Sequence, residues 1–382
     1  MPAPTTTVPS PEAKKTEVPF TPSELAERTL YRRAVEAVIW GMPAVNFDLL
    51  SQAMLQAKAA WNQVVFWSRP ADWRNQTLTP NLDTIYFFPF FNTKDAGPMV
   101  LEIPPASGGS ITGSVDDAWQ AALEDVGPAG VDKGNGGKYL ILPPAYKDKV
   151  PDGYIGMPSD TYAGFAALRS NLASGSEADI ANAVAYGKRV KFYPLTQAAN
   201  SPATKFVDAI DVVFDNTITY DLRFFQSLNR FVQREPWMER DKAMIDQLKS
   251  IGIEKGKPFN PDPKTQEILK EAAREAQSWL DLKYHDVFLP PFNEGTHWAL
   301  PASAEVVEAM QTLFANRNAY PVDGRAVSYS LAYFSAKHLG EGPVLSDDHR
   351  GQERTALRRR QHLSPHRAAE RSRQTVLVRN GL

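Results

Sequence analysis

The chain has 382 residues, of which 43% are hydrophobic and 23% charged, and its formal net charge is −2. This composition is ordinary for a soluble globular protein, and a nearly neutral chain has no overall field that would attract nucleic acid or a membrane surface. Because cysteine is absent, disulfides, thiolate metal sites and a cysteine nucleophile are excluded. The length predicts two or three domains.

The first twenty residues are rich in proline and threonine and predict a disordered linker. They lack the apolar core of a complete secretory signal, although they resemble the linker that often follows a cleaved one. Both an exported protein with a trimmed start and a cytoplasmic protein therefore fit this segment. No stretch is apolar for long enough to span a bilayer, so no membrane span is expected.

Helices are predicted on both sides of a β-rich stretch. Thr21, Pro22 and Glu24 have the pattern of a helix start. This helix is expected to run to Trp40 and to break at the Gly-Met-Pro sequence of residues 41–43. Further helical patterns cover residues 47–60, 161–171, 177–186, 224–231, 244–251, 263–282 and 306–314.

Short β-branched and aromatic runs, separated by Asn, Asp, Gly and Pro, predict strands. They cover residues 64–67, 84–91, 99–103, 139–142, 190–194 and 327–334. The sequence therefore predicts an α+β fold. Its N-terminal domain is expected to be β-rich and sandwich-like, with a helical cap and a helical insert, followed by the start of a second, truncated β domain.

A polar cluster within residues 77–86 is the first candidate ligand site. Thr79, Asn81 and Asp83 are spaced two apart, so in an extended segment their side chains face the same way. Together with Tyr86 they could hydrogen-bond a polar ligand. The alternative, favoured on residue types alone, is a turn whose side chains cap their own backbone.

Asp116 and Asp117 form a second candidate, since paired carboxylates can perform general acid–base chemistry. Adjacent residues usually point apart, and the favoured alternative is a helix start before Trp119. Arg325 is a third candidate because its guanidinium could bind a ligand carboxylate. A structural clamp between Asp323 and Arg325 is at least as well supported.

His285, His297 and Glu294 are weak candidates for a hard-metal site, because their spacing matches no zinc-helix motif. Solvated loop residues are the favoured alternative. The sequence also lacks a phosphate-binding glycine loop and a nucleophile elbow. No resident metal and no cofactor are therefore expected.

Four motifs resemble a bacterial family known by placeholder names. They are NQTLTPNLDTIYFFPFF, GPMVLEIPP, GGKYLILPPAYKDKVPDGY and YPVDGRAVSYSLAYF. The family pairs an N-terminal module, domain of unknown function 1254, with a C-terminal module, domain of unknown function 1214. The resemblance implies an exported, β-rich protein with no established catalytic residues. It places the first module at residues 21–196, a mainly helical connection at 197–300, and the start of the second module at 301–342.

The residues that match the family motifs are the following: Thr79, Asn81, Asp83, Thr84 and Tyr86 in the first module, and Asp323, Gly324 and Arg325 in the second.

The segment 343–382 differs from the rest of the chain, with nine arginines, no lysine and no apolar period. A shifted reading frame of suitable codons restores strand-like sequence typical of the family's C-terminal end. We therefore expect an out-of-frame tail after a frameshift near residues 341–343. Such a tail would pack poorly, leave an unpaired sheet edge at residues 327–334 and lower the solubility of the chain.

Two functions remain open from the sequence. One is an exported hydrolase or lyase acting on a small polar or carbohydrate-like substrate, and the other is a non-catalytic envelope or ligand-binding protein. In both, the expected partner is a small molecule and not nucleic acid. The oligomeric state and the reaction are open.

Overall fold

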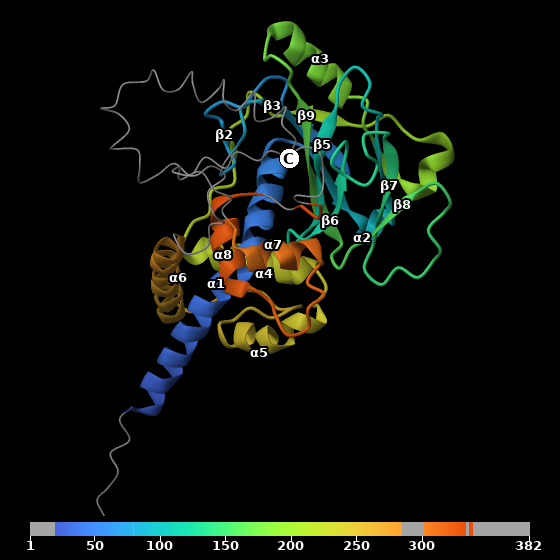
Figure 1. The fold of residues 1–382 in the computed structure, drawn as a ribbon. Coiled ribbons are helices and arrows are strands. Elements are labelled where there is room, and N and C mark those ends of the chain that lie inside the picture. Colours follow the sequence, from blue (N-terminus) through green and yellow to red (C-terminus); the bar gives the residue numbers. More distant parts are fainter. Residues whose placement is uncertain (1–19, 79, 285–301, 334–335, 339–382) are drawn as a thin grey trace, which may run out of the picture.

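The computed structural model describes residues 20–78, 80–284, 302–333 and 336–338. The fold contains a six-stranded sheet and a four-stranded sheet. In Figure 1 the larger sheet lies between the smaller sheet and a group of helices. The predicted α+β fold is therefore confirmed.

The six-stranded sheet has the order β11-β1-β3-β9-β5-β6. β1 pairs with β11 in parallel, and all other neighbouring strands of this sheet pair antiparallel. The strands are β1 (Gln63–Phe66), β3 (Thr84–Asn92), β5 (Ile111–Asp117), β6 (Ala122–Val126), β9 (Ala163–Asn171) and β11 (Phe206–Asp208).

The four-stranded sheet has the order β10-β4-β7-β8. A separate two-stranded ribbon joins β2 to β12. These strands are β4 (Met99–Ile103), β7 (Gly137–Leu142), β8 (Ile155–Pro158), β10 (Lys191–Pro194), β2 (Asn75–Gln76) and β12 (Phe214–Asp215).

Successive side chains of a strand point to opposite faces, so the larger sheet contributes to one core on each face. In β1, Val65 belongs to the core shared with the helices, whereas Val64 and Phe66 belong to the core between the two sheets. In β9, Phe165 faces the helices and Leu168 faces the smaller sheet. Both faces of the sheet are covered, so the inner strand β3 is buried at every residue except Asn92.

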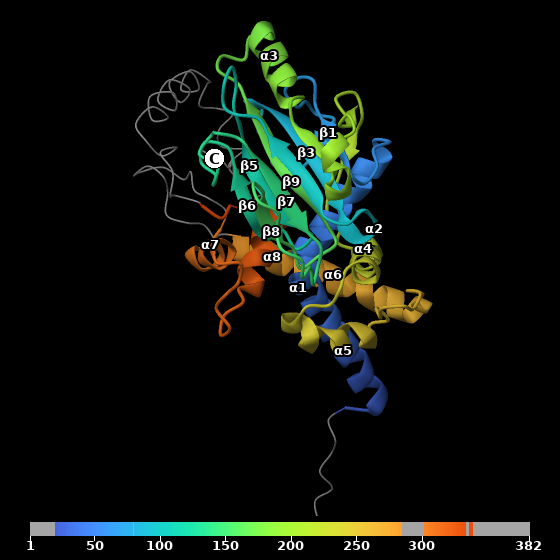
Figure 2. The same cartoon turned by 90° about the vertical axis from the view of Figure 1, so that its right-hand side faces the viewer.

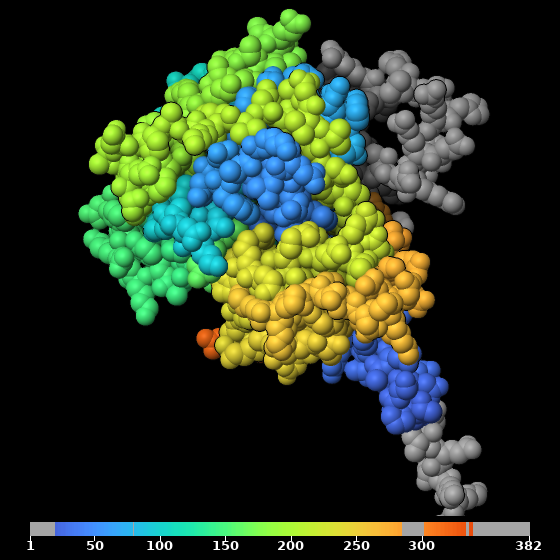
Figure 3. Space-filling view, turned by 180° about the vertical axis from the view of Figure 1, so that it is seen from behind, coloured from blue at the N-terminus to red at the C-terminus, as the bar shows by residue number. Residues whose placement is uncertain are grey.

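The helices are α1 (Pro22–Gln56), α2 (Thr93–Ala96), α3 (Glu177–Gly187), α4 (Leu222–Arg234), α5 (Lys242–Ser250), α6 (Pro263–Lys283), α7 (Ala304–Gln311) and α8 (Val322–Leu331), with short 3₁₀ helices η1 (Leu195–Asn200) and η2 (Glu239–Asp241). α1 runs through the helical side and packs against α4, α5, α6 and α8 (Figures 1 and 2). Figure 3 shows its first turns projecting beyond the body. Although α1 has 35 residues, no helix in the described part of the chain is long and apolar enough to cross a membrane.

The predicted helix break at residues 41–43 is wrong, because α1 continues through Pro43 to Gln56. An internal proline costs a helix about 3 kcal/mol. Burial outweighs this cost, since Met42, Val45 and Phe47 are fully buried and each contributes about 1.5–3 kcal/mol. Gly41 allows the close approach of α4, because a Cβ there would lie 3.0 Å from a methyl carbon of Leu228.

The helix predicted at residues 161–171 is also wrong, because this segment forms β9. Its alanines, leucine and arginine are helix formers in isolation. In the fold, however, the segment pairs with β3 on one side and β5 on the other. The backbone hydrogen bonds of a central strand and burial on two faces override the local preference.

The strand predicted at residues 327–334 is wrong as well: α8 is a helix that ends at Leu331. The alternation of Val, Ser and Tyr in this stretch is typical of a strand, but Ala326, Val327 and Tyr329 are all buried in the helical core. Residues 302–333 hold α7 and α8 and no strand. This part of the chain therefore does not form the predicted start of a β domain or an unpaired sheet edge, and the loss of solubility argued from that edge has no basis in it.

Most other predicted elements are confirmed within a few residues. They are the strands at residues 64–67, 84–91, 99–103, 139–142 and 190–194 and the helices at 177–186, 224–231, 244–251, 263–282 and 306–314. The tail at residues 343–382 lies outside the described residues.

Candidate functional site

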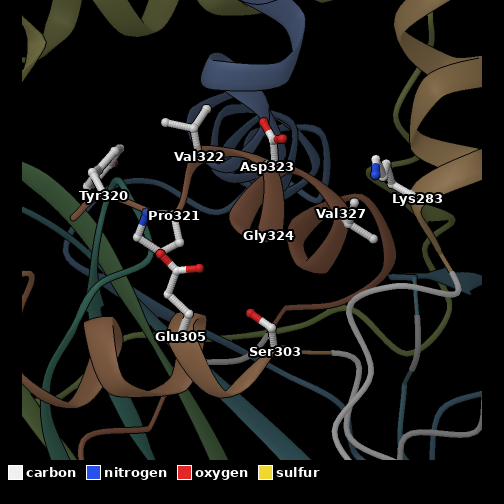
Figure 4. Close-up of a pocket in the computed structure, with 9 residues that line it drawn as sticks. All are labelled: Lys283, Ser303, Glu305, Tyr320, Pro321, Val322, Asp323, Gly324 and Val327. Atoms are coloured by element: carbon white, nitrogen blue, oxygen red, sulfur yellow. The ribbon is translucent and has the colours of Figure 1, made fainter.

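A pocket lies where the end of α6 meets the first turns of α7 and α8. Its volume is about 410 Å³. Figure 4 shows Lys283 reaching toward it from α6, Ser303 and Glu305 from the start of α7, and Asp323 on the first turn of α8. The remaining lining residues are Tyr320, Pro321, Val322, Gly324 and Val327. The pocket therefore combines polar side chains of both charges with an apolar wall.

Local helix chemistry places these side chains. The Ser303 hydroxyl caps α7 by accepting from the Val306 amide at 3.2 Å. That cap puts Glu305 in the first turn of α7, and Asp323 likewise lies in the first turn of α8. Acidic residues are favoured in first turns because they offset the helix dipole. Helix stability alone could thus account for both carboxylates, but it does not account for their meeting at one cavity.

Gly324 brings the first turns of α7 and α8 together. A Cβ at this position would lie 2.5 Å from the Cγ2 atom of Val306, closer than two carbon atoms can approach without displacement. The absent side chain therefore sets the separation of two walls of the pocket.

We expect Gly324→Ala to push α7 away from α8 and to destabilise the fold by about 1–3 kcal/mol, the usual cost of overpacking. Chemical denaturation checks the loss of stability. Replacing Val306 by alanine in the same chain should recover part of it, because the clashing methyl group is then removed. Equal stabilities of the wild type and Gly324→Ala would contradict this description of the pocket wall.

Tyr320 connects the pocket to a group of buried charges behind α8. Its ring lines the pocket, and its hydroxyl accepts a hydrogen bond from Nη1 of Arg325. Nη2 of Arg325 donates to the backbone carbonyl of Trp119, 206 residues away in sequence. Arg325 is only 1% exposed. It therefore ties the pocket wall to the turn between β5 and β6.

Aromatic rings surround this guanidinium. The Cζ atom of Arg325 lies 4.6 Å from the ring centre of Phe314, 5.2 Å from that of Tyr320 and 5.6 Å from that of Tyr329. Arg240, from η2, lies over two of the same rings, at 5.1 Å from Phe314 and 5.3 Å from Tyr320. Cation–π contacts of this kind stabilise a desolvated guanidinium.

Two carboxylates balance the two guanidiniums. Asp117 and Asp241 are 3% and 1% exposed. Burial raises the pKa of each carboxyl to about 6, and the attraction of Arg240 and Arg325 offsets only part of that rise. Within the described part of the chain, neither carboxylate oxygen of Asp241 has a hydrogen-bond partner. These four groups therefore carry no net charge when all are ionised, and the exposed Asp160 adds a negative charge that acts on Asp117 and Arg240. Removing one of the four leaves a buried charge without its partner, which is costly.

Asp117 also organises the β5–β6 turn. Its Oδ1 atom accepts from the amides of Trp119 at 2.8 Å and Ala121 at 2.9 Å. The predicted helix start at this position is wrong, because Asp117 ends strand β5 and Gln120 turns the chain with a φ of 57°. Of the sequence candidates, Asp117 and Arg325 are thus brought into one electrostatic cluster.

Arg325 does not share the pocket with Asp323. Side chains two positions apart in an α-helix point in directions that differ by about 200° around its axis. Asp323 therefore faces the pocket, whereas Arg325 is buried behind α8. The clamp predicted between these two residues is therefore wrong, since the guanidinium donates to Tyr320 and Trp119 instead.

The first sequence candidate forms a loop away from the pocket. The Asn81 side chain accepts from the Asp83 amide at 2.8 Å, and the Asn81 amide donates to the Tyr86 hydroxyl at 2.8 Å. Asn81 thus caps its own backbone, as the turn alternative describes. Asp83 is exposed and Tyr86 is buried. Thr79 lies outside the described residues.

The weak metal candidates His285, Glu294 and His297 also lie outside the described residues. In the part that is described, no group of three or more His, Asp or Glu side chains is arranged to hold a metal ion.

Sequence reasoning missed Lys283, Ser303 and Glu305 in the pocket. They are ordinary polar residues at helix ends, with no motif to distinguish them. It also missed Arg240 and Asp241 in the buried cluster, since only the tertiary fold brings η2 beside α8.

Part of the chain matches a known family. Residues 61–194 match the model of the family described as protein of unknown function (DUF1254). Three of the four motifs named above fall inside this range. The match supports the resemblance for the first module, which covers most of both larger sheets.

Among solved structures, a similar fold is found in a bacterial protein. This is the VPA0106 protein from Vibrio parahaemolyticus, whose crystal structure matches with a TM-score of 0.54 and 14% sequence identity. The similarity covers 81% of this chain and 68% of that one. At this identity the likeness extends to the fold alone. No curated protein matches the sequence.

Proposed function

We propose that the chain binds a small polar ligand, such as a carbohydrate-like molecule, in the pocket between α6, α7 and α8. The composition of the pocket lining carries this proposal. Polar side chains from three helices meet apolar ones around a cavity of about 410 Å³. Pockets that hold small ligands have similar volumes, and a few polar groups beside apolar walls give them specificity. The non-catalytic binding role, one of the two functions open from the sequence, has its strongest support here.

A hydrolase or lyase is the second candidate function. Glu305 and Asp323 carry carboxylates to the same cavity as Lys283 and Tyr320. These four residue types serve as general acids and bases in enzymes. An enzyme acting on a small polar substrate would therefore use this pocket, and not the loop that contains Asn81.

A screen of small sugars, amino acids and other polar metabolites for thermal stabilisation tests the binding proposal. A compound present at about 100 times its Kd stabilises the fold by about 2.7 kcal/mol. We expect the double variant Glu305→Gln/Asp323→Asn to lose about half of this stabilisation. Glu308→Gln, an exposed site on α7 outside the pocket lining, should keep all of it. Compounds that stabilise the double variant as strongly as the wild type would contradict the proposed site.

Each compound that binds can then be incubated with the protein and followed by mass spectrometry. Turnover that the double variant loses would favour the hydrolase or lyase. Binding without turnover would favour the non-catalytic role.

Export to the periplasm or the medium is a further proposal, supported by the family resemblance, with a cytoplasmic protein as the alternative. Fractionation of cells that express the complete natural gene tests it. We expect the protein in the osmotic-shock fraction, and its retention with cytoplasmic markers would contradict export.

We also propose that residues 343–382 are translated out of frame and replace the end of a C-terminal module of the kind called domain of unknown function 1214. The support is compositional: nine arginines, no lysine and no apolar period. Resequencing the codons for residues 341–345, together with an intact mass of the natural product, tests the proposal. An unchanged reading frame and a matching mass would contradict it.

A further inference from the structure

The pocket presents charges of opposite sign on different walls. Glu305 comes from α7 and Asp323 from α8, and both are exposed, while Lys283 is the last residue of α6 (Figure 4). Such a lining can pair with two separate charges on one ligand.

The helix ends change the charge balance of the pocket. A helix N-terminus is equivalent to about half a positive charge. The first turns of α7 and α8 together therefore contribute about +1, and the side chains contribute −2 from Glu305 and Asp323 and +1 from Lys283. Over the lining residues that belong to the described part of the chain, the sum is about zero. A neutral balance made of separated charges selects a ligand that is itself neutral overall but carries both signs.

We infer that the ligand is a small zwitterion of amino-acid or dipeptide size, which carries an ammonium group and a carboxylate. The ammonium group pairs with Glu305 and Asp323, and the carboxylate pairs with Lys283. This inference rests on the proposed function and specifies the class of ligand for the same pocket. The volume of about 410 Å³ is sufficient for a dipeptide.

Lys283 makes a smaller contribution than the two carboxylates. It has a further contact of its own, which a ligand carboxylate would have to share or displace. Exposed ion pairs are in any case weak, and each changes affinity by about threefold. The selectivity should thus come from the sum of several modest contacts.

Four dipeptide derivatives of nearly equal size separate the charges. They are alanylalanine, its C-terminal amide, its N-acetyl derivative, and the derivative blocked at both ends, which are respectively zwitterionic, cationic, anionic and neutral at pH 7. Glucose is added as an uncharged polar probe. Affinities for the full chain are measured by calorimetry.

We expect alanylalanine to bind about 25-fold more tightly than the doubly blocked derivative, with the amide in between at about ninefold. Glu305→Gln and Asp323→Asn should each weaken binding of alanylalanine and of the amide by about threefold. Neither should weaken binding of the anionic N-acetyl derivative, because the lost carboxylate repelled it. Lys283→Gln should instead weaken the binding of alanylalanine and of the N-acetyl derivative. Glu308→Gln, on the same helix as Glu305 but outside the pocket lining, should change none of these affinities.

The outcomes distinguish this inference from the proposed function. If the doubly blocked derivative or glucose binds as tightly as alanylalanine and the pocket variants weaken it, the pocket is a ligand site but the zwitterion is wrong. If the variants lower the affinity for all four dipeptides equally, the proposed charge pairing is likewise wrong. If none of the probes binds and the metabolite screen is also empty, both proposals are overturned.

Discussion

Replacing Arg325 by methionine is expected to destabilise the protein by about 3–5 kcal/mol at pH 7.5, which is the usual cost of removing one partner from a buried ion pair. The variant keeps most of the side-chain volume, so the loss reports charge and hydrogen bonds more than packing. Arg240 alone would then face the buried carboxylates Asp117 and Asp241. The hydrogen bonds to Tyr320 and Trp119 would also be lost.

Urea unfolding measures this loss, with Arg317→Met as the control because Arg317 is an exposed arginine of the preceding loop. The loss of stability in Arg325→Lys should lie between those of Arg325→Met and Arg317→Met. Lysine keeps the positive charge but cannot make both hydrogen bonds of the guanidinium. The penalty for Arg325→Met should shrink at pH 5, where the carboxyls take up protons. A loss no larger than that of Arg317→Met would show that the cluster is not an important source of stability.

Replacing Asp241 by asparagine is expected to remove part of the pH dependence of stability. The pKa of this buried carboxyl is about 6 in the folded protein, against 3.8 as its ordinary value. The folded state therefore binds more protons than the unfolded state between these values. The free energy of unfolding thus falls as the pH rises from about 4 to above 6. This difference between the two pKa values corresponds to about 3 kcal/mol of unfolding free energy. Asp117, whose pKa is raised to about 6 as well, adds a similar contribution.

The measurement is the free energy of unfolding of the wild type and of Asp241→Asn at several pH values from 4 to 8. Relative to the wild type, the variant should gain about 2.5 kcal/mol from pH 4 to pH 8, because asparagine does not titrate. Asp246→Asn, at an exposed residue of α5, controls for a change of surface charge. Parallel pH profiles for the wild type and Asp241→Asn would contradict the raised pKa.

The sequence was sufficient for elements whose local pattern and tertiary environment agree. β4 and β7 are short β-branched runs between turn residues, and α6 begins with Asp262 as its N-cap and Pro263 as its first residue. The errors arose where the fold overrides local preference. The segment of β9 contains helix-forming residues but lies between two partner strands. The sequence of α8 alternates between apolar and polar residues, as in a strand, but the segment packs as a helix against α1.

The candidate site was only partly predictable for a related reason. Asp117 and Arg325 could be chosen as reactive residue types, yet their shared cluster depends on contacts between residues about 200 positions apart. Glu305 and Lys283 carry no motif, because a charged residue near a helix end is usually solvated. Their convergence on one pocket is a property of how α6, α7 and α8 pack.

The most direct test of the binding site is a map of amide chemical shifts on titration with alanylalanine, or with whichever compound the metabolite screen returns. The pocket proposal predicts that the largest changes fall on residues 303–306 and 320–324, and that the double variant Glu305→Gln/Asp323→Asn needs about ninefold more ligand to reach them. Changes centred on residues 80–86 would instead assign the site to the loop that contains Asn81 and Asp83 and would contradict the account.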